Sequence, residues 1–375
     1  MKFNVSSKAF YNATSAVSKV INSKNALTIL DNFFIRLEGS ILTITGSDQE
    51  NALTARLEVT GTKGEGSFCL GARRLVELLK ELPDQGVTVN IDDRTLEVQL
   101  EYASGHYSFV GLPGDQYPQF TTPEGEAPIS FSIATEQMLA GLDNTMFAVS
   151  NDEYRQIMQG VLMDVAPDSI TFVATDTRKL VRYIDRRTAP GVKGACVIPA
   201  KPSTVIKNVF AKEETLNIKM NARNAVIESE HYTFQCTFLN GTFPDYNRVI
   251  PKNNTLVLNV DRTALLNAVR RVGIFVEMDG GLEKFRITPE CILLKSNDPN
   301  LCTSAREQVP CSFSGKELTI GFSANYLMEI LTTLKGQEVV VNLGDAGRPG
   351  VFRPGEEPEN TELVMLLMPM TVGDF

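Results

Sequence analysis

The stretch SSKAFYNATSAVSKVI, residues 6–21, sets a pattern that the chain repeats twice. ATEQMLAGLDNTMFAV begins at residue 134 and DRTALLNAVRRVGIFV at residue 261, so the three starts lie 128 and 127 residues apart. Each stretch has a Ser, Thr or Asp at its first or second position that can cap a helix, and apolar residues follow at spacings of three and four. The pattern therefore predicts three equivalent helices.

A second set of helix-like stretches lies between the first, and strand–turn–strand stretches separate the two sets. The second set is GARRLVELLKELP from residue 71, PAKPSTVIKNVFAK from residue 199 and SANYLMEILTTLKG from residue 323. The strand–turn–strand stretches are LTITGSDQENALTARLEV (42–59), ITFVATDTRKLVRYIDR (170–186) and ILLKSNDPNLCTSAREQV (292–309). Each pairs two alternating runs across a polar turn, which is typical of an antiparallel hairpin.

Self-similarity at one period indicates repeated domains. We predict an α+β fold of three domains, each with two helices and antiparallel sheets, at residues 1–125, 126–253 and 254–375. About 125 residues is an ordinary domain size. The joins are expected at TTPEGEAP (121–128) and IPKNN (250–254), which are rich in proline, glycine or polar residues.

Composition indicates a reduced cytosolic protein. The N-terminus carries no apolar run long enough for a secretory signal or a membrane span. The six cysteines include no CxxC pair, and we expect them to be small buried hydrophobic residues. Only two histidines occur, His106 and His231, without Cys or His neighbours at ligand spacing, so we expect neither a metal site nor a cofactor.

Charge is unevenly distributed along the chain. The formal net charge is -9, which by itself argues against a nucleic-acid partner. The six helix-like segments (7–22, 72–82, 135–149, 201–212, 261–272 and 323–335) nevertheless carry a net +6, leaving -15 on the remainder. Helices often carry Lys and Arg on a solvated face, which is one interpretation. The other is a basic helical surface that faces a polyanion within an acidic shell.

The sequence resembles the bacterial beta sliding clamps, the processivity factors of replicative DNA polymerase, over its whole length. The resemblance rests on the threefold repeat and on the motifs GLPGDQYPQF (111–120), ATDTRKL (174–180), FPDYNRVIP (243–251) and LLMPM (366–370). It implies a head-to-tail homodimeric ring of six domains around double-stranded DNA. It further implies binding of the polymerase catalytic subunit, the clamp loader and other clamp-binding-motif proteins, with no membrane partner and no catalytic activity.

The resemblance also implies a partner-peptide pocket between the second and third domains. Its residues are expected to be Met158, Thr175, Thr177, Leu180, Pro244, Arg248, Val249, Leu366, Met368 and Met370. Methionines repack readily, and prolines keep a loop rigid, so both suit a surface that accepts several peptides. Two positions depart from the family pattern: Thr177 replaces a common glycine and narrows one wall, and Thr371 replaces a basic residue.

Two further groups of residues follow from the same resemblance. The DNA-facing residues are expected to be Lys24, Arg73, Arg74, Arg155 and Lys201, and the ring-closing residues are expected to be Tyr107, Phe109, Ile274 and Phe275. Without the resemblance, the last two have an ordinary core interpretation.

Two alternatives compete with a clamp. Asp48, Asp176 and Asp298 recur at equivalent repeat positions and could mark an enzyme, although a triplicated acid is better explained as a turn former. No Walker loop, GxGxxG or GxSxG motif is present. The second alternative is a monomeric scaffold that binds peptides but not DNA.

Overall fold

The computed structural model describes residues 1–118, 128–276, 281–298 and 300–373. Most of the predicted join at 121–128 lies outside these residues. The chain divides into two compact units, one made of Met1–Leu139 and Lys201–Phe238, the other of Ala140–Ala200 and Leu239–Phe375.

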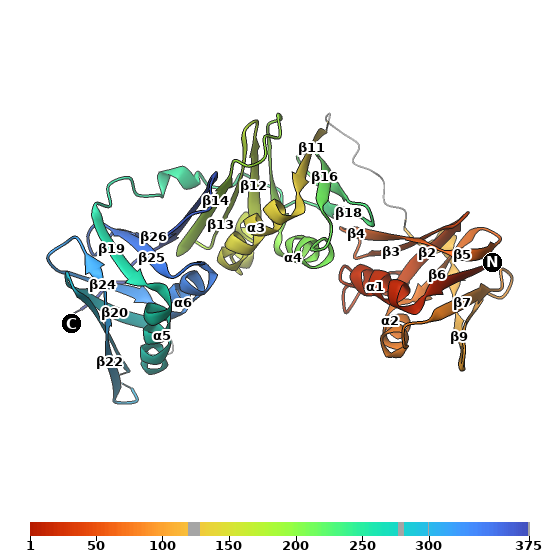
Figure 1. The fold of residues 1–375 in the computed structure, drawn as a ribbon, viewed down its shortest axis with the longest axis horizontal. Coiled ribbons are helices and arrows are strands. Elements are labelled where there is room, and N and C mark those ends of the chain that lie inside the picture. Colours follow the sequence, from red (N-terminus) through yellow and green to blue (C-terminus); the bar gives the residue numbers. More distant parts are fainter. Residues whose placement is uncertain (119–127, 277–280, 299, 374–375) are drawn as a thin grey trace. The chain divides into compact units, whose positions relative to one another are not determined.

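Six α-helices occur in the described chain, two in each predicted third (Figure 1). They are α1 (Ser7–Ser18), α2 (Ala72–Glu81), α3 (Thr135–Thr145), α4 (Ala200–Val209), α5 (Arg262–Val272) and α6 (Ala324–Thr333). The sequence predicted all six, although α3 and α5 end earlier than expected. A 3₁₀ turn follows each of these two, η3 (Met146–Ala148) and η6 (Gly273–Phe275).

The first helix of each pair was predicted to begin at a capping side chain. Ser6 caps α1 by accepting a hydrogen bond from the Ala9 amide, and Asp261 caps α5 by accepting one from Ala264 at 2.7 Å. Thr135 is instead the first residue of α3, and its buried hydroxyl has no hydrogen-bond partner within the described residues. The capping prediction is therefore confirmed for two of the three helices.

The first unit contains two antiparallel sheets. The five-stranded sheet runs β5 (Thr60–Lys63), β1 (Lys2–Ser6), β7 (Gly86–Ile91), β8 (Glu97–Tyr102), β9 (Gly105–Val110). The first nine-stranded sheet runs β10 (Leu112–Pro113), β6 (Gly66–Gly71), β2 (Asn32–Glu38), β3 (Ile41–Ser47), β4 (Ala52–Glu58), β18 (Tyr232–Thr237), β17 (Asn224–Glu228), β16 (Thr215–Met220), β11 (Ile129–Ala134).

The second unit contains two more antiparallel sheets. The second nine-stranded sheet runs β15 (Gly194–Pro199), β12 (Gly160–Ala166), β13 (Ser169–Thr175), β14 (Lys179–Asp185), β27 (Thr361–Leu367), β26 (Gly350–Pro354), β25 (Glu338–Leu343), β19 (Leu256–Asp261), β23 (Ser312–Phe313). The four-stranded sheet runs β22 (Thr303–Pro310), β21 (Cys291–Asp298), β20 (Leu282–Ile287), β24 (Leu318–Ser323).

The two nine-stranded sheets explain why three repeats form two units. In the first, β4 pairs with β18, which joins strands of the first and second predicted thirds. In the second, β14 pairs with β27 and so joins the second third to the last. The middle third is thus shared between two continuous sheets. The α+β architecture with antiparallel sheets is confirmed.

The cysteine prediction is right in part. Cys69, Cys196 and Cys236 are buried in the core. Burial raises the pKa of the Cys236 thiol to about 12, so it stays protonated at neutral pH. Cys291 and Cys311 are half-buried, and the prediction is wrong for Cys302, which is exposed because it lies in the β21–β22 turn.

Candidate functional site

A pocket of about 220 Å³ lies within the second unit, where β13 and β27 end and β14 begins, beside the loop 241–251. It is lined by Met158, Thr175, Thr177, Lys179, Leu180, Phe243, Pro244, Tyr246, Val249, Leu366 and Met368. Eight of the ten predicted pocket residues are in this lining. Arg248 and Met370 are not: the Arg248 side chain is exposed and pairs with Asp245 at 2.8 Å, and Met370 bridges Gly321.

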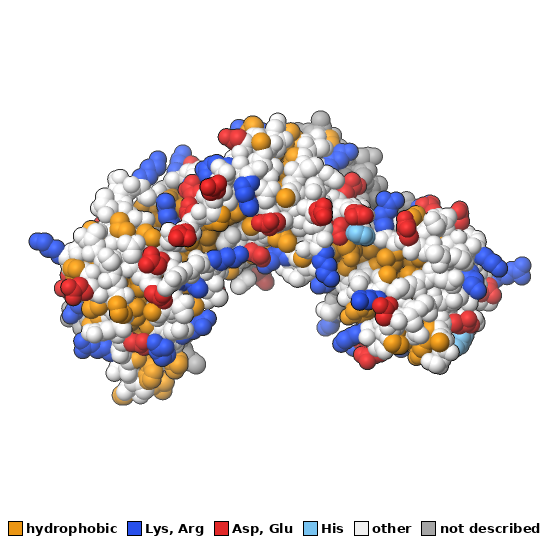
Figure 2. All heavy atoms as spheres, viewed as in Figure 1, with side chains coloured by type: hydrophobic (Ala, Val, Ile, Leu, Met, Phe, Trp, Pro, Cys, Tyr) orange, Lys and Arg blue, Asp and Glu red, His pale blue; other side chains and the backbone are white. Residues whose placement is uncertain are grey.

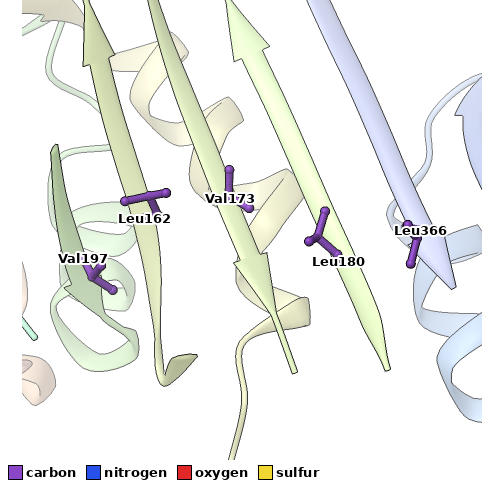
Figure 3. Close-up of a cluster of buried hydrophobic side chains, with 5 residues drawn as sticks. All are labelled: Leu162, Val173, Leu180, Val197 and Leu366. Carbon is purple, nitrogen blue, oxygen red and sulfur yellow. The ribbon is translucent and has the colours of Figure 1, made fainter. Parts of the chain in front are cut away.

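A hydrophobic cluster on neighbouring strands supplies two of the lining residues, Leu180 and Leu366. Leu162, Val173, Leu180, Val197 and Leu366 come from β12, β13, β14, β15 and β27, and each is at most 7% exposed (Figure 3). Phe243, Tyr246 and Ile250 pack against this cluster. Side chains two residues apart on a strand share one face, so the strand pairing places these residues together although they lie far apart in sequence.

Hydrogen bonds and packing anchor the loop 241–251 beside this cluster. Gly241 has φ +138°, which favours glycine, and the Asp245 side chain accepts a hydrogen bond from the Asn247 amide at the start of η5 (Tyr246–Arg248). Burial and the nearby Asp164 carboxylate raise the pKa of Tyr246. Its protonated hydroxyl donates to Asp164 at 3.4 Å. The loop therefore needs little reorganisation when a ligand enters.

Apolar side chains also reach the mouth of the pocket. Val249 is 47% exposed and Met368 is 36% exposed, although both are large hydrophobic residues. Exposed apolar groups beside a preformed cavity are typical of a ligand site.

One wall is formed by the turn between β13 and β14. Thr177 has φ +77°, a left-handed conformation that side chains with a branched Cβ rarely adopt. The Thr177 amide donates to Thr175 Oγ1 at 3.1 Å, and its hydroxyl accepts from Arg155 Nη1 at 2.9 Å. Arg155 also lies 3.5 Å from Asp152. Arg155, expected to face DNA, is thus engaged at the rim of the pocket.

Lys179 is a buried cation in the same wall that the sequence did not indicate. Its side chain is 5% exposed, and Nζ lies 3.2 Å from Asp176 and 2.5 Å from Glu329 on α6. Nζ also lies 4.3 Å from the centre of the Tyr326 ring. The lysine therefore fixes the β13–β14 turn against α6. Lys179, Phe243 and Tyr246 were missed as lining residues even though they belong to the motifs at 174–180 and 243–251.

The other expected DNA-facing residues lie in the first unit. Lys24, Arg73 and Arg74 are exposed, and Arg73 pairs with Glu77 at 2.9 Å. Lys201 is engaged: Nζ donates to Val20 O at 2.6 Å and pairs with Asp48 at 2.5 Å.

The expected ring-closing residues lie on edge elements. Tyr107 and Phe109 belong to β9, where Tyr107 stacks on Tyr102 at 6.0 Å. Ile274 and Phe275 belong to η6 and are 78% and 37% exposed. Apolar side chains are visible at the surface around both regions (Figure 2).

The three repeated acids form turns, as predicted. Asp48 accepts amide hydrogen bonds from Glu50 and Asn51. Asp176 and Asp298 each accept the equivalent pair, from the residues two and three positions further on. Among the described residues, no group of three or more His, Cys, Asp or Glu could hold a metal ion. No described helix has the length and apolar character needed to cross a membrane.

Comparisons with known proteins agree along the whole chain. Residues 1–121, 132–245 and 247–371 match the N-terminal, central and C-terminal domain models of the DNA polymerase III beta subunit. The beta sliding clamp of Pseudomonas aeruginosa is 26% identical over 374 residues, covering 99% of this chain and 100% of the relative. That of Bacillus subtilis is 26% identical over 381 residues, covering 99% of each.

Solved structures show the same fold. The DNA polymerase III subunit beta of Pseudomonas aeruginosa matches with a TM-score of 0.92 at 23% identity, covering 99% of this chain and 100% of that one. A sliding clamp of Bartonella birtlesii bound to griselimycin matches with a TM-score of 0.92 at 25% identity and the same coverage. With three consecutive domain models matched in order, the chain belongs to the family of DNA polymerase III beta subunits.

Proposed function

We propose that the protein is a DNA sliding clamp. Two copies close head to tail into a ring around duplex DNA, without sequence preference and without catalysis. The pocket in the second unit then tethers the replicative polymerase and other DNA-processing proteins to that ring. The family membership supports this function, and the sheet edges and the pocket support its mechanism.

The observation that carries the ring is the pair of open sheet edges. β9 ends the five-stranded sheet and β22 ends the four-stranded sheet, and each has one neighbour among the described strands. Pairing β9 of one copy with β22 of another would give nine strands, the same number as each of the two complete sheets. An unpaired strand edge is a template for pairing with another chain. Because these two edges differ, the contact is head to tail, and two such contacts close a ring.

Apolar side chains flank this joint. Ile274 is 78% exposed on η6, next to the four-stranded sheet, and Tyr107 and Phe109 lie on β9. Burying such residues between two copies would stabilise the joint by about 1.5–3 kcal/mol for each large side chain.

The DNA-facing role belongs to the helices. They carry a net +6 against -15 on the rest of the chain, so they attract phosphate while the outer strands repel it. A net +6 spread over six helix segments gives few fixed phosphate contacts, so we expect direct DNA affinity to be weak and closure around the duplex to hold the protein there.

The pocket suits a short peptide with large apolar anchors. Its lining is mostly apolar and its rim offers Thr177 and Arg155 as polar partners. Two buried anchors contribute roughly 3–6 kcal/mol before association costs. Micromolar binding needs about 8 kcal/mol, so hydrogen bonds to the peptide would have to supply the remainder. The Bartonella birtlesii clamp bound to griselimycin supports a ligand site in this family.

The ring is tested by the mass of the protein in solution. Sedimentation of the full chain should give twice 41.3 kDa. Ile274→Asp should shift the mass toward 41.3 kDa without unfolding, because the side chain is exposed in one copy. Tyr154→Asp, at a residue 99% exposed on η4 (Glu153–Met158) in the middle third of the chain, which contributes no strand to this joint, is the matched control and should remain dimeric. A wild-type monomer at micromolar concentration would overturn the ring.

A further inference from the structure

The three acidic turns share one geometry but not one set of partners. In each, Oδ1 of the aspartate accepts the amides two and three residues further on. At Asp48 and Asp176, the other oxygen, Oδ2, holds a lysine ammonium: Lys201 at 2.5 Å and Lys179 at 3.2 Å. Asp298 is only 6% exposed, yet it makes no ion pair within the described residues.

The lysine at the first turn comes from a fixed position of the repeat. Lys201 is the second residue of α4, which begins at Ala200. The equivalent helices α2 and α6 also begin at an alanine, Ala72 and Ala324, and their second residues are Arg73 and Asn325. Arg73 and Lys201 are thus the two cations at this position.

The second turn shows what happens when the helix lacks the cation. Asn325 carries no charge, so it cannot pair with Asp176 as Lys201 pairs with Asp48. The ammonium at Asp176 comes instead from Lys179, which lies opposite Asp176 in the hairpin. Lys179 then reaches α6 through Glu329. At both Asp48 and Asp176, one lysine links the turn to the helix of the following repeat.

Within the described residues, the third turn has no cation of its own. The residue opposite Asp298 in the β21–β22 hairpin is Thr303, which carries no charge. The first turn is alike in this respect, because the uncharged Asn51 lies opposite Asp48. The first turn receives its cation from the next helix in the repeat. After the third repeat, that helix is α2 of another copy.

We propose that Arg73 forms an ion pair with the partner subunit's Asp298 across each joint of the ring. The inference rests on the proposed head-to-tail closure, because it repeats at the joint what Lys201 and Asp48 do within one chain. It assigns Arg73 to ring closure, although the sequence placed it among the DNA-facing residues.

The surroundings of Arg73 suit this role. Its side chain is 90% exposed and held by Glu77, itself 62% exposed, and an exposed pair of this kind costs little to exchange. A guanidinium can bond to a carboxylate with two parallel N–H groups, which fixes direction as well as charge. The two amides of the third turn hold the carboxylate in place before the partner arrives.

The pair is tested by a double-mutant cycle on the dimer dissociation constant of the full chain. Arg73→Ala should raise that constant at least about tenfold, the usual effect of losing a hydrogen bond to a charged group. Asp298→Asn should do the same, since it keeps one oxygen for the turn but removes the charge. The double variant should be no weaker than the weaker single variant. Lys80→Ala, which removes an exposed charge from the same helix, is the control and should leave the constant unchanged.

Charge reversal gives a sharper test. Arg73→Asp and Asp298→Lys protomers should each dimerise poorly alone. Mixed together, they should form heterodimers, because one joint then carries the reversed pair and the other carries the original pair. Asp298→Lys also removes the hydrogen bonds that the carboxylate accepts within the turn. This cost is present in the heterodimer as well as in the Asp298→Lys homodimer, so it cannot by itself favour the heterodimer.

The outcomes separate this inference from the proposed function. If the wild-type chain is monomeric, the ring and the ion pair both fail. If the wild-type chain is dimeric but Arg73→Ala matches Lys80→Ala and the charge-reversed protomers do not mix, the ring stands and the ion pair is refuted. Loss of retention on DNA by Arg73→Ala with an unchanged dimer would likewise refute the pair and return Arg73 to the DNA-facing set.

Discussion

Replacing Lys179 with methionine tests how the pocket wall is held. The lysine is 5% exposed and its ammonium lies within reach of two carboxylates, Asp176 at 3.2 Å and Glu329 at 2.5 Å. Methionine fills a similar volume without charge. The variant therefore leaves Asp176, which is 13% exposed, without its cation, although two backbone amides still bond to it.

The expected loss is moderate. Removing one partner of a fully buried ion pair costs about 3–5 kcal/mol. Glu329 is 44% exposed and can rehydrate, so we expect about 2–3 kcal/mol, or a fall of ~5–10 °C in the melting temperature of this unit. Lys179 also lines the pocket, so affinity for a labelled clamp-binding peptide, of the Gln-x-x-Leu-Phe type that the family resemblance implies, should fall in the same variant.

Differential scanning calorimetry and fluorescence polarisation measure the two effects. Lys252→Met, at an exposed lysine of the same unit, is the matched control and should change neither. A Lys179→Met protein with the wild-type melting temperature and wild-type peptide affinity would refute the argument that the buried cation holds the wall.

Three other changes have definite expected outcomes. Glu283 is fully buried, its carboxylate has no hydrogen-bond partner within the described residues, and burial raises its pKa to about 8. Because the folded state keeps a proton that the unfolded state releases, the free energy of unfolding should fall by about 1.4 kcal/mol per pH unit between about pH 4.5 and 8 and level off above. Glu283→Gln should remove that slope in urea unfolding. Met368→Ala should weaken peptide binding several-fold in fluorescence polarisation while shifting the melting temperature little, because Met368 lies at the pocket mouth; a large stability loss with unchanged affinity would contradict its placement there. Lys201→Met should lower the melting temperature of the first unit, since its ammonium joins Val20 and Asp48, and an unchanged melting temperature with weaker DNA retention would instead favour the DNA-facing role.

The repeat made much of the fold predictable from sequence. Helix periodicity is a local signal, so all six helices were found, and the acids at 48, 176 and 298 were identified as turn formers. Pairing between β4 and β18, and between β14 and β27, was not predictable from local patterns, because residues about 180 positions apart meet there. The division of the chain into two units follows from this pairing.

The site was predictable as far as its motifs reach. FPDYNRVIP and LLMPM indicated the pocket, and most of its expected residues line it. The environments of Arg155 and Lys201 were not predictable, because the local sequence around a cation on a helix or turn does not indicate whether that cation faces solvent or a carboxylate. The burial of Lys179 was not predictable either. This lysine lies at a polar turn, where an exposed side chain is expected, but it is buried because Glu329 and Tyr326 of a helix distant in sequence contact it.

Retention on circular DNA tests the ring most directly. The full chain would be assembled on a nicked circular plasmid with a clamp loader and ATP, then separated from free protein by gel filtration in high salt. The account predicts that the protein stays with the circle in high salt and is lost once a restriction enzyme linearises the plasmid. Retention that is equal on circular and linear DNA, or loss from the circle in high salt, would contradict a closed ring around the duplex.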